Sequence, residues 1–200
     1  FVRDKEGEMH TPPEHGRQSG KVSAGFLASV FGFFLSISCE FGIAFWSAAL
    51  LSDRVGSSAA LSTLAVITFV SGIAFCRWFV APYFHKVHID DQLRLAFTLQ
   101  GLAFGVFWLS HSMPLSLLAL FGVGMGVAIQ FPLFSVRTIA FSENRPDLAI
   151  GYNSLAAGSA IALSPFMLGV LGDSFGISRA YLMIPILLSL IHISEPTRPY

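Results

Sequence analysis

Hydrophobic residues gather in long blocks along the chain. Five apolar stretches are separated by short polar segments, and a sixth starts near Ala180 and is cut short. A helix needs about 20 apolar residues to cross the hydrocarbon core of a bilayer, and the stretches are close to that length. The pattern therefore predicts an all-α, polytopic bundle of transmembrane helices. The five predicted helices are Ala24–Leu50, Ala59–Ala81, Leu95–Ser110, Pro114–Phe141 and Ala149–Leu171.

The polar segments mark where helices are expected to end. The first block is followed by Ser52–Arg54, and Pro82 stops the second because proline lacks the N–H that continues a helix. Residues 1–22 mix both signs of charge with two prolines, which predicts a solvated linker without a core. Residues 23–187 are predicted to form the transmembrane bundle.

Composition supports lipid as the solvent. The 200 residues are 54% hydrophobic and 12% charged, whereas soluble domains have about 25% charged residues. The formal net charge is +0, so no overall field favours nucleic acid as a partner. Cys39 and Cys76 both lie in apolar runs without metal-ligand spacing. We expect no disulfide framework, no metal site, no cofactor and no enzymatic activity.

The end of the chain is interpreted separately. The stretch Leu188–Arg198 is identical to the in-frame translation of an adapter used in transposase-based sequencing libraries. Residues 188–200 are therefore predicted to be an artefact, and such segments do not inform the fold. We expect the natural protein to continue beyond Leu187, and to begin upstream of Phe1 because that residue is not an initiator methionine.

Basic residues predict the orientation of the helices, because cytoplasmic loops are enriched in Lys and Arg. The linker, the second-to-third connection and the fourth-to-fifth connection are richer in basic residues than the loops on the opposite side. The linker is therefore predicted to be cytoplasmic, and the first helix is predicted to run outward. The basic residues on the predicted cytoplasmic side are Arg3, Lys5, Arg17, Lys21, Arg77, Lys86, Arg94, Arg137 and Arg145.

Glu40 is the leading candidate for a functional residue. It interrupts the first apolar block near its middle, and at 100° per residue Ser36, Glu40 and Ser47 fall in one sector of the helix. Polar groups in hydrocarbon are costly and usually functional. No Lys or Arg lies one turn away, so burial favours the uncharged acid. We predict a proton or substrate-cation site; the alternative is a permanently protonated glutamate bonded to a neighbouring helix.

Further polar residues lie inside the other blocks. Gln100 is in the middle of the third block, Gln130 and Arg137 share a face of the fourth, and Asn153 and Ser164 share a face of the fifth. These residues could line a substrate or proton pathway. Equally, Gln100, Asn153 and the serines could bond across helices as structural contacts.

A second group of residues is predicted to have structural or gating roles. Arg77 and Arg137 lie near the predicted cytoplasmic ends, where long basic side chains snorkel to the interface. Pro132 and Pro165 lie within blocks and should bend or loosen their helices. Tryptophans towards helix ends are expected to anchor the bundle at the membrane interface. They are Trp46, Trp78 and Trp108.

Small residues predict close helix contacts. Gly101 and Gly105 are four residues apart in the third block, and Gly122 and Gly126 are four apart in the fourth, with Gly124 between them. Such spacing allows helix backbones to approach closely. Both faces are expected to pack on neighbouring helices.

These segments resemble the major facilitator superfamily of transporters. The segment Gly122–Pro132, followed by Asn153–Pro165 and Gly169–Gly176, is similar to the tenth and eleventh helices of that family, and it includes Asp173 among the structural or gating residues. The segment Cys39–Trp46 resembles the seventh helix of bacterial permeases, where a carboxylate often sits in a similar place.

One connection departs from the family pattern. Residues 81–91 lack the G-x-x-x-D-R-x-G-R-R loop, and only Arg77 fits the weaker version of that motif found in the second half of these transporters. The rest of the resemblance covers about residues 24–187, with the linker matching the central cytoplasmic loop.

The resemblance implies a twelve-helix secondary transporter of which this chain is the C-terminal six-helix half. Its partners would be a small-molecule solute, the lipid bilayer and the missing N-terminal half, in a bacterial inner membrane. The expected mechanism is alternating access, and coupling to protons is a hypothesis. The alternatives are a channel, a membrane enzyme whose active half lies elsewhere, or a fragment without activity. Short connections supply no selectivity filter, and no catalytic cluster is visible.

The predicted orientation is testable with fusions. A reporter fused after Lys86 should be cytoplasmic and one fused after Ser110 external, because basic residues concentrate on the predicted cytoplasmic side. Paired phosphatase and fluorescent-protein fusions at both positions measure this. The opposite pattern would invert the whole topology.

Overall fold

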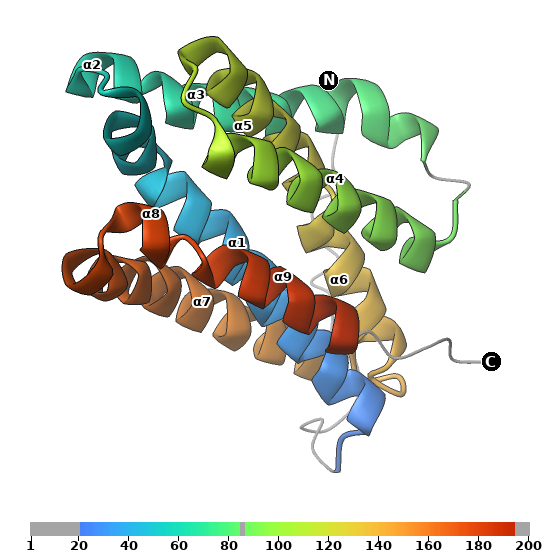
Figure 1. Cartoon of the computed structure of the whole chain (residues 1–200). Coiled ribbons are helices and arrows are strands. Elements are labelled where there is room, and N and C mark those ends of the chain that lie inside the picture. Colours follow the sequence, from blue (N-terminus) through green and yellow to red (C-terminus); the bar gives the residue numbers. More distant parts are fainter. Residues whose placement is uncertain (1–20, 85–86, 195–200) are drawn as a thin grey trace, which may run out of the picture.

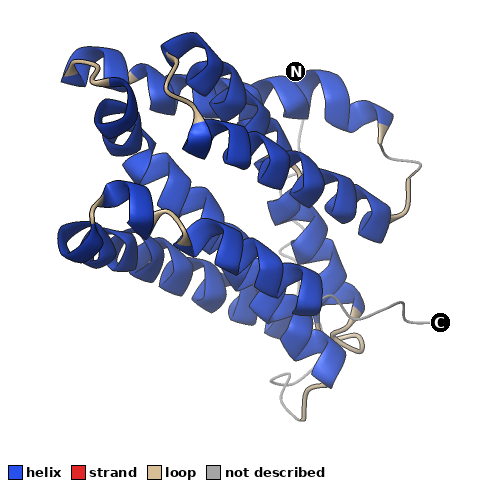
Figure 2. Ribbon diagram, viewed as in Figure 1, coloured by secondary structure: helices blue, strands red, loops and turns tan. Residues whose placement is uncertain are grey.

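The structure is a computed structural model that describes residues 21–84 and 87–194, and all regular secondary structure in these residues is helical (Figure 2). The predicted linker therefore lies almost entirely outside the described residues. The longer helices are α1 (Ala24–Val55), α3 (Leu64–Phe75), α4 (Ile89–Leu109), α5 (Met113–Val127), α6 (Gln130–Ala140), α7 (Pro146–Phe175) and α9 (Met183–Ser194). The short ones are α2 (Ala59–Ser62), η1 (Cys76–Val80), η2 (Ala81–Tyr83) and α8 (Ile177–Ala180).

Within the described residues the helices form six units, as the apolar blocks predict. Four units are long and apolar enough to cross a membrane, and this length and composition indicate an integral membrane protein. A shorter apolar helix covers Ile177–Ile191. The four candidate spans are Ala24–Val55, Ala60–Tyr83, Met113–Ala140 and Pro146–Phe175.

The predicted membrane helix at Leu95–Ser110 is helical but is not among the four candidate spans. It lies in α4, whose first turn contains Asp90 and Asp91, and Arg94 follows. These charges, together with Gln100 further along, lower the apolarity of the helix. Apolarity therefore does not support the prediction of a membrane span at this position.

Helices α1, α4 and α7 are longer than predicted, and caps mark both ends of α1. The side chain of Ser23 accepts a hydrogen bond from the backbone N–H of Phe26 at the start of α1. At the other end α1 continues through the polar segment after Leu50 and stops at Gly56, which has a left-handed φ of 66°. Helix α7 starts at Pro146 and ends before Gly176, whose φ is 83°.

Helix α1 runs through the middle of the bundle, with α7 and α9 along one side and α3, α4 and α5 on the other (Figure 1). Helices α1 and α7 are parallel, since the rings of Phe26 and Tyr152 lie 5.4 Å apart near their starts. Further along, Trp46 Nε1 donates to the carbonyl oxygen of Pro165 at 2.9 Å. The buried core includes Phe33 of α1 and Phe134 of α6.

Glycines set the contacts of α5 with its neighbours. A Cβ at Gly72 would run into the carbonyl oxygen of Phe121, and a Cβ at Gly124 would run into that of Phe69. The backbones of α3 and α5 therefore touch directly. On its other side, a Cβ at Gly126 would lie 2.7 Å from the backbone nitrogen of Gln100 in α4. The predicted small-residue contact of the fourth block is confirmed.

The matching prediction for the third block is wrong. No atom lies within 4 Å of a Cβ placed at Gly105, and at Gly101 the nearest atom is a methyl group of Leu188 at 4.0 Å. The reason is the orientation of α4, which presents Gln100 to α5 and turns the glycine face towards a groove beside α9. Small residues permit close approach, but they do not enforce it.

Large apolar side chains cover much of the outer surface. Leu102, Leu118, Leu155 and Phe166 are among the exposed ones and come from three different helices. Exposed apolar area on this scale is unusual for a soluble monomer and suits contact with lipid. The described part of the chain thus has an apolar exterior as well as an apolar core.

Helix α9 extends into the segment predicted to be an adapter artefact. It continues to Ser194, and Leu188 and Ile191 are buried against the core. Apolar residues of any origin pack in this way when they extend an apolar helix, so the interpretation of residues 188–200 stays a prediction.

Substitution of the contact glycines should separate α3 from α5. We expect Gly124→Ala and Gly72→Ala each to destabilise the bundle by about 1–3 kcal/mol, because the added methyl group meets rigid backbone. Thermal unfolding in detergent measures the effect. Gly105→Ala is the matched control, since its Cβ enters open space, and it should be neutral or stabilising by up to about 1 kcal/mol. Equal effects at all three positions would contradict the assigned contact.

Candidate functional site

A chain of hydrogen bonds links three helices inside the bundle. Ser36 Oγ of α1 donates to Gln130 Oε1 of α6 at 2.6 Å, and Gln130 Nε2 donates to Gln100 Oε1 of α4 at 2.7 Å. Gln130 Nε2 also donates to the carbonyl oxygen of Gly126 at 3.0 Å. Each of the three side chains is at most 1% exposed. The structure therefore brings together three residues that the sequence predicts separately as pathway candidates.

The backbone fixes the direction of this chain. The carbonyl of Gly126 can only accept, so the Gln130 amide must turn its NH₂ group towards it and its oxygen towards Ser36. Gln100 must then turn its own oxygen towards Gln130. The chain ends on Gln100 Nε2, which has no hydrogen-bond partner among the described residues. Two buried N–H donors are thus directed away from Gln130.

Gln130 reaches its partners because the fourth predicted block is interrupted. The helix breaks at Ala128 and Ile129 into α5 and α6, and Ile129 departs from helical geometry with a ψ of −7°. Gln130 is the first residue of α6. The prediction that Pro132 loosens this helix is consistent with the break. In contrast, α7 continues without interruption through Pro165.

Glu40 lies one helical turn from Ser36 on α1 and is half-buried. The sequence shows no cation one turn away on the same helix, but the structure supplies one from another helix. The positive charge of Arg77, in the π-helical segment η1, acts on the Glu40 carboxyl group. Sequence reasoning missed this pair because the two residues are far apart along the chain.

Arg77 is directed into the bundle as well as towards the surface. Its Nε donates to the carbonyl oxygen of Ala128 at 2.9 Å, at the break between α5 and α6. Snorkelling to the interface is therefore not the full role of Arg77, because its guanidinium also bonds η1 to the break between α5 and α6. The side chain of Arg77 is exposed in spite of this bond, whereas Glu40 is half-buried.

The other predicted pathway residues are Ser164 and Asn153 on the buried face of α7, and Ser47, which is buried on α1. Ser164 Oγ donates to the carbonyl oxygen of Ser38, which joins α7 to α1. Asn153 is buried and Ser47 is fully buried, and neither Asn153 Oδ1 nor Ser47 Oγ has a hydrogen-bond partner among the described residues. Asn153 and Ser164 share the buried face of α7, as predicted. They do not contact the Ser36 chain directly in any described hydrogen bond.

Arg137 forms an ion pair inside the structure. It is buried, and its Nη1 lies 3.5 Å from Asp90 Oδ1 at the start of α4. Gln130 and Arg137 share one buried face of α6, as predicted, but they serve different partners. The sequence analysis did not predict a role for Asp90. Because a buried arginine needs a carboxylate partner, the position of Arg137 within an apolar block could have pointed to such a partner.

Asp173 and the tryptophans occupy separate places. Asp173 is exposed near the end of α7, away from the polar chain. Trp46 bonds to Pro165 between α1 and α7, and its predicted interfacial role stays a prediction. Trp108 Nε1 donates to the carbonyl oxygen of Ser178, with Arg54 stacked over its ring, and Trp78 is exposed.

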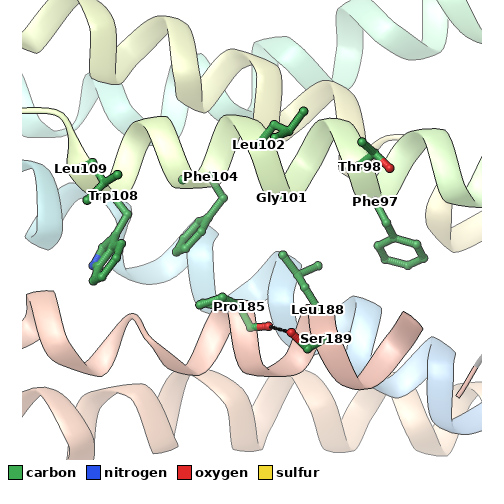
Figure 3. A pocket seen from close by; sticks show the side chains of 11 residues that line it. Phe97, Thr98, Gly101, Leu102, Phe104, Trp108, Leu109, Pro185, Leu188 and Ser189 are labelled. Atoms are coloured by element: carbon green, nitrogen blue, oxygen red, sulfur yellow. Dashed lines mark hydrogen bonds between the residues drawn. The ribbon is translucent and has the colours of Figure 1, made fainter. Parts of the chain in front are cut away.

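A groove of about 750 Å³ lies between α4 and α9 (Figure 3). Apolar side chains such as Phe104 and Trp108 line it, together with the glycine face of α4. None of the predicted pathway residues lines this groove. Leu188 and Ser189 of α9 do, and both belong to the segment interpreted as an artefact.

Comparison with known proteins does not assign the chain to a family. No protein-family model matches the chain, and no curated protein is significantly similar to it. The observed basis for a function is therefore the buried polar chain of Ser36, Gln130 and Gln100 with the nearby pair of Glu40 and Arg77. The described residues contain no group of three metal-ligating side chains.

Gln130 should be the most sensitive residue of the polar chain. We expect Gln130→Leu to destabilise the bundle by about 1–3 kcal/mol, because Ser36, Gln100 and the Gly126 carbonyl lose their partner. Combination with Ser36→Ala should reveal a coupling of about 0.5–2 kcal/mol in unfolding experiments in detergent. Ser135→Ala on the same helix bonds only to its own backbone and is the control. Purely additive effects would show that the bond between Ser36 and Gln130 does not form.

Proposed function

We propose that the chain forms the C-terminal half of a secondary active transporter of the major facilitator type, which moves a small solute by alternating access. The observation that carries the proposal is Glu40, a half-buried carboxylate in the middle of a 32-residue apolar helix. It lies one turn from a buried hydrogen-bond chain that connects α1 with α4 and α6. Polar groups inside an apolar membrane bundle are energetically costly, so those that are present usually have a function.

The arrangement of helices supports this proposal. Six helical units in the described residues agree with one half of a twelve-helix transporter, and such transporters place their sites near the membrane midplane between two halves. Glu40 and Ser36 lie near the middle of α1. A second six-helix half, supplied by the same polypeptide, would complete the cavity in a bacterial plasma membrane, with the linker on the cytoplasmic side.

The direction of the hydrogen-bond chain suggests a class of solute. Gln100 ends the chain with two buried N–H donors that no described residue accepts. A donor of this kind pairs with an oxygen acceptor such as a carbonyl, carboxylate or hydroxyl group. We therefore infer a solute that has an acceptor oxygen, which binds Gln100 in a conformation that opens the side facing away from Gln130.

Glu40 would couple transport to protons. When the carboxyl group is open to one side it takes a proton from water, and when access changes to the other side it returns that proton to water. The protonated acid is neutral and suits the apolar interior. The carboxylate formed on release is stabilised by the positive charge of Arg77. One proton is thus carried for each complete cycle.

Substitution of Glu40 tests the coupling. In the complete transporter, Glu40→Gln keeps shape and hydrogen bonding but cannot titrate, so uptake driven by a pH gradient should fall by at least about tenfold. Counterflow exchange should persist, because it needs no net proton movement. Both activities are measured in proteoliposomes with a panel of radiolabelled solutes that have acceptor oxygens.

The matched control is Glu143→Gln, which changes an exposed glutamate in the loop between α6 and α7. It should leave both activities unchanged. If Glu40→Gln concentrates solute against a gradient as well as the parent does, Glu40 is not the coupling residue. If the parent protein transports none of the panel, the proposed solute class is wrong.

A further inference from the structure

The joint between α5 and α6 is capped by an arginine from another helix. Pro132 has no N–H, so the carbonyl four residues earlier, that of Ala128, loses its normal helical donor. Arg77 Nε donates to this carbonyl oxygen at 2.9 Å. The guanidinium therefore replaces the hydrogen bond that the proline removes. A carbonyl without a donor in an apolar bundle would otherwise be destabilising.

The local geometry on both sides of this bond is unusual. Arg77 lies in the π-helical segment Cys76–Val80, a wider turn than an α-helix, and such turns are frequent at functional sites. On the other side, Ile129 departs from helical geometry immediately before α6 begins. Neither feature is needed for a simple membrane span. Together they place a long, charged side chain against a weak point of the neighbouring helix.

We propose that Arg77 fixes the α5–α6 joint by capping the Ala128 carbonyl, in place of the helical hydrogen bond that Pro132 cannot form. With the cap in place the joint is fixed. With the cap removed the Ala128 carbonyl loses its donor, and α6 is free to bend at Ile129. Gln130 starts α6, so the polar chain to Ser36 moves with it.

This inference concerns the mechanics of the fold and goes beyond transport. It holds whether or not the protein moves a solute, so its failure and that of the transport proposal are distinguishable. The bond from the backbone N–H of Leu133 to the carbonyl oxygen of Ile129, 3.1 Å long, spans the joint and reports its opening. Hydrogen–deuterium exchange of the Leu133 amide, measured in detergent by mass spectrometry, is the readout.

Restoring the missing donor provides the decisive test. Arg77→Gln should speed exchange at Leu133 by about tenfold or more, since the carbonyl loses a charged donor. Pro132→Ala supplies a helical N–H to the Ala128 carbonyl, so in that background Arg77→Gln should have little effect. Pro165→Ala is the matched control, because this proline is in α7, and it should not relieve the effect of Arg77→Gln.

Equal acceleration by Arg77→Gln with and without Pro132 would overturn the cap. If Arg77→Gln alone yields no folded protein, the double variant decides the question. Recovery of folding by Pro132→Ala supports the proposal, and failure of both variants contradicts it, because the restored N–H makes the cap dispensable.

Discussion

Hydrocarbon offers no hydrogen-bond partner, so each polar group inside a membrane bundle must find one in the protein. Gln130 connects four helices through its hydrogen bonds. It is the first residue of α6, and its side chain bonds to Ser36 of α1, to Gln100 of α4 and to the carbonyl of Gly126 near the end of α5. Its amide can satisfy all three partners in one orientation only. The relative positions of these helices are therefore coupled through a single side chain.

The glycine contact between α3 and α5 makes the arginine cap possible. Because Gly72 and Gly124 allow the two backbones to touch, the segment η1 that follows α3 lies beside the end of α5. Arg77 then reaches the Ala128 carbonyl without crossing a layer of side chains. A packing feature and an electrostatic feature thus depend on each other, and the charge of Arg77 also acts on Glu40, the candidate for proton binding.

Periodicity predicts most of what belongs to a single helix. The helical blocks, the buried faces shared by Gln130 with Arg137 and by Asn153 with Ser164, and the break near Pro132 all follow from neighbours within a few residues. Partners on different helices do not follow, because they depend on rotation and register. Arg77 with Glu40 and Arg137 with Asp90 are pairs of this kind.

The glycine motifs illustrate the same limit. Gly101 and Gly105 have the spacing that Gly122 and Gly126 have, yet only the second pair faces close neighbours, through Gly122 against Ala103 and Gly126 against Gln100. The spacing states that close approach is sterically allowed. Whether a neighbour uses it depends on how the whole bundle distributes its buried polar groups, and α4 is turned so that Gln100 meets Gln130.

The three tryptophans give the protein built-in optical reporters of distinct regions. Trp46 is half-buried and bonded between α1 and α7, Trp108 is covered by Arg54 at one end of the bundle, and Trp78 is exposed beside Arg77. Indole emission depends on the polarity and hydrogen bonding around the ring. Separation of α1 from α7 would therefore alter the fluorescence of Trp46 while Trp78 continued to report lipid or detergent, so relative helix motion can be followed without an attached dye.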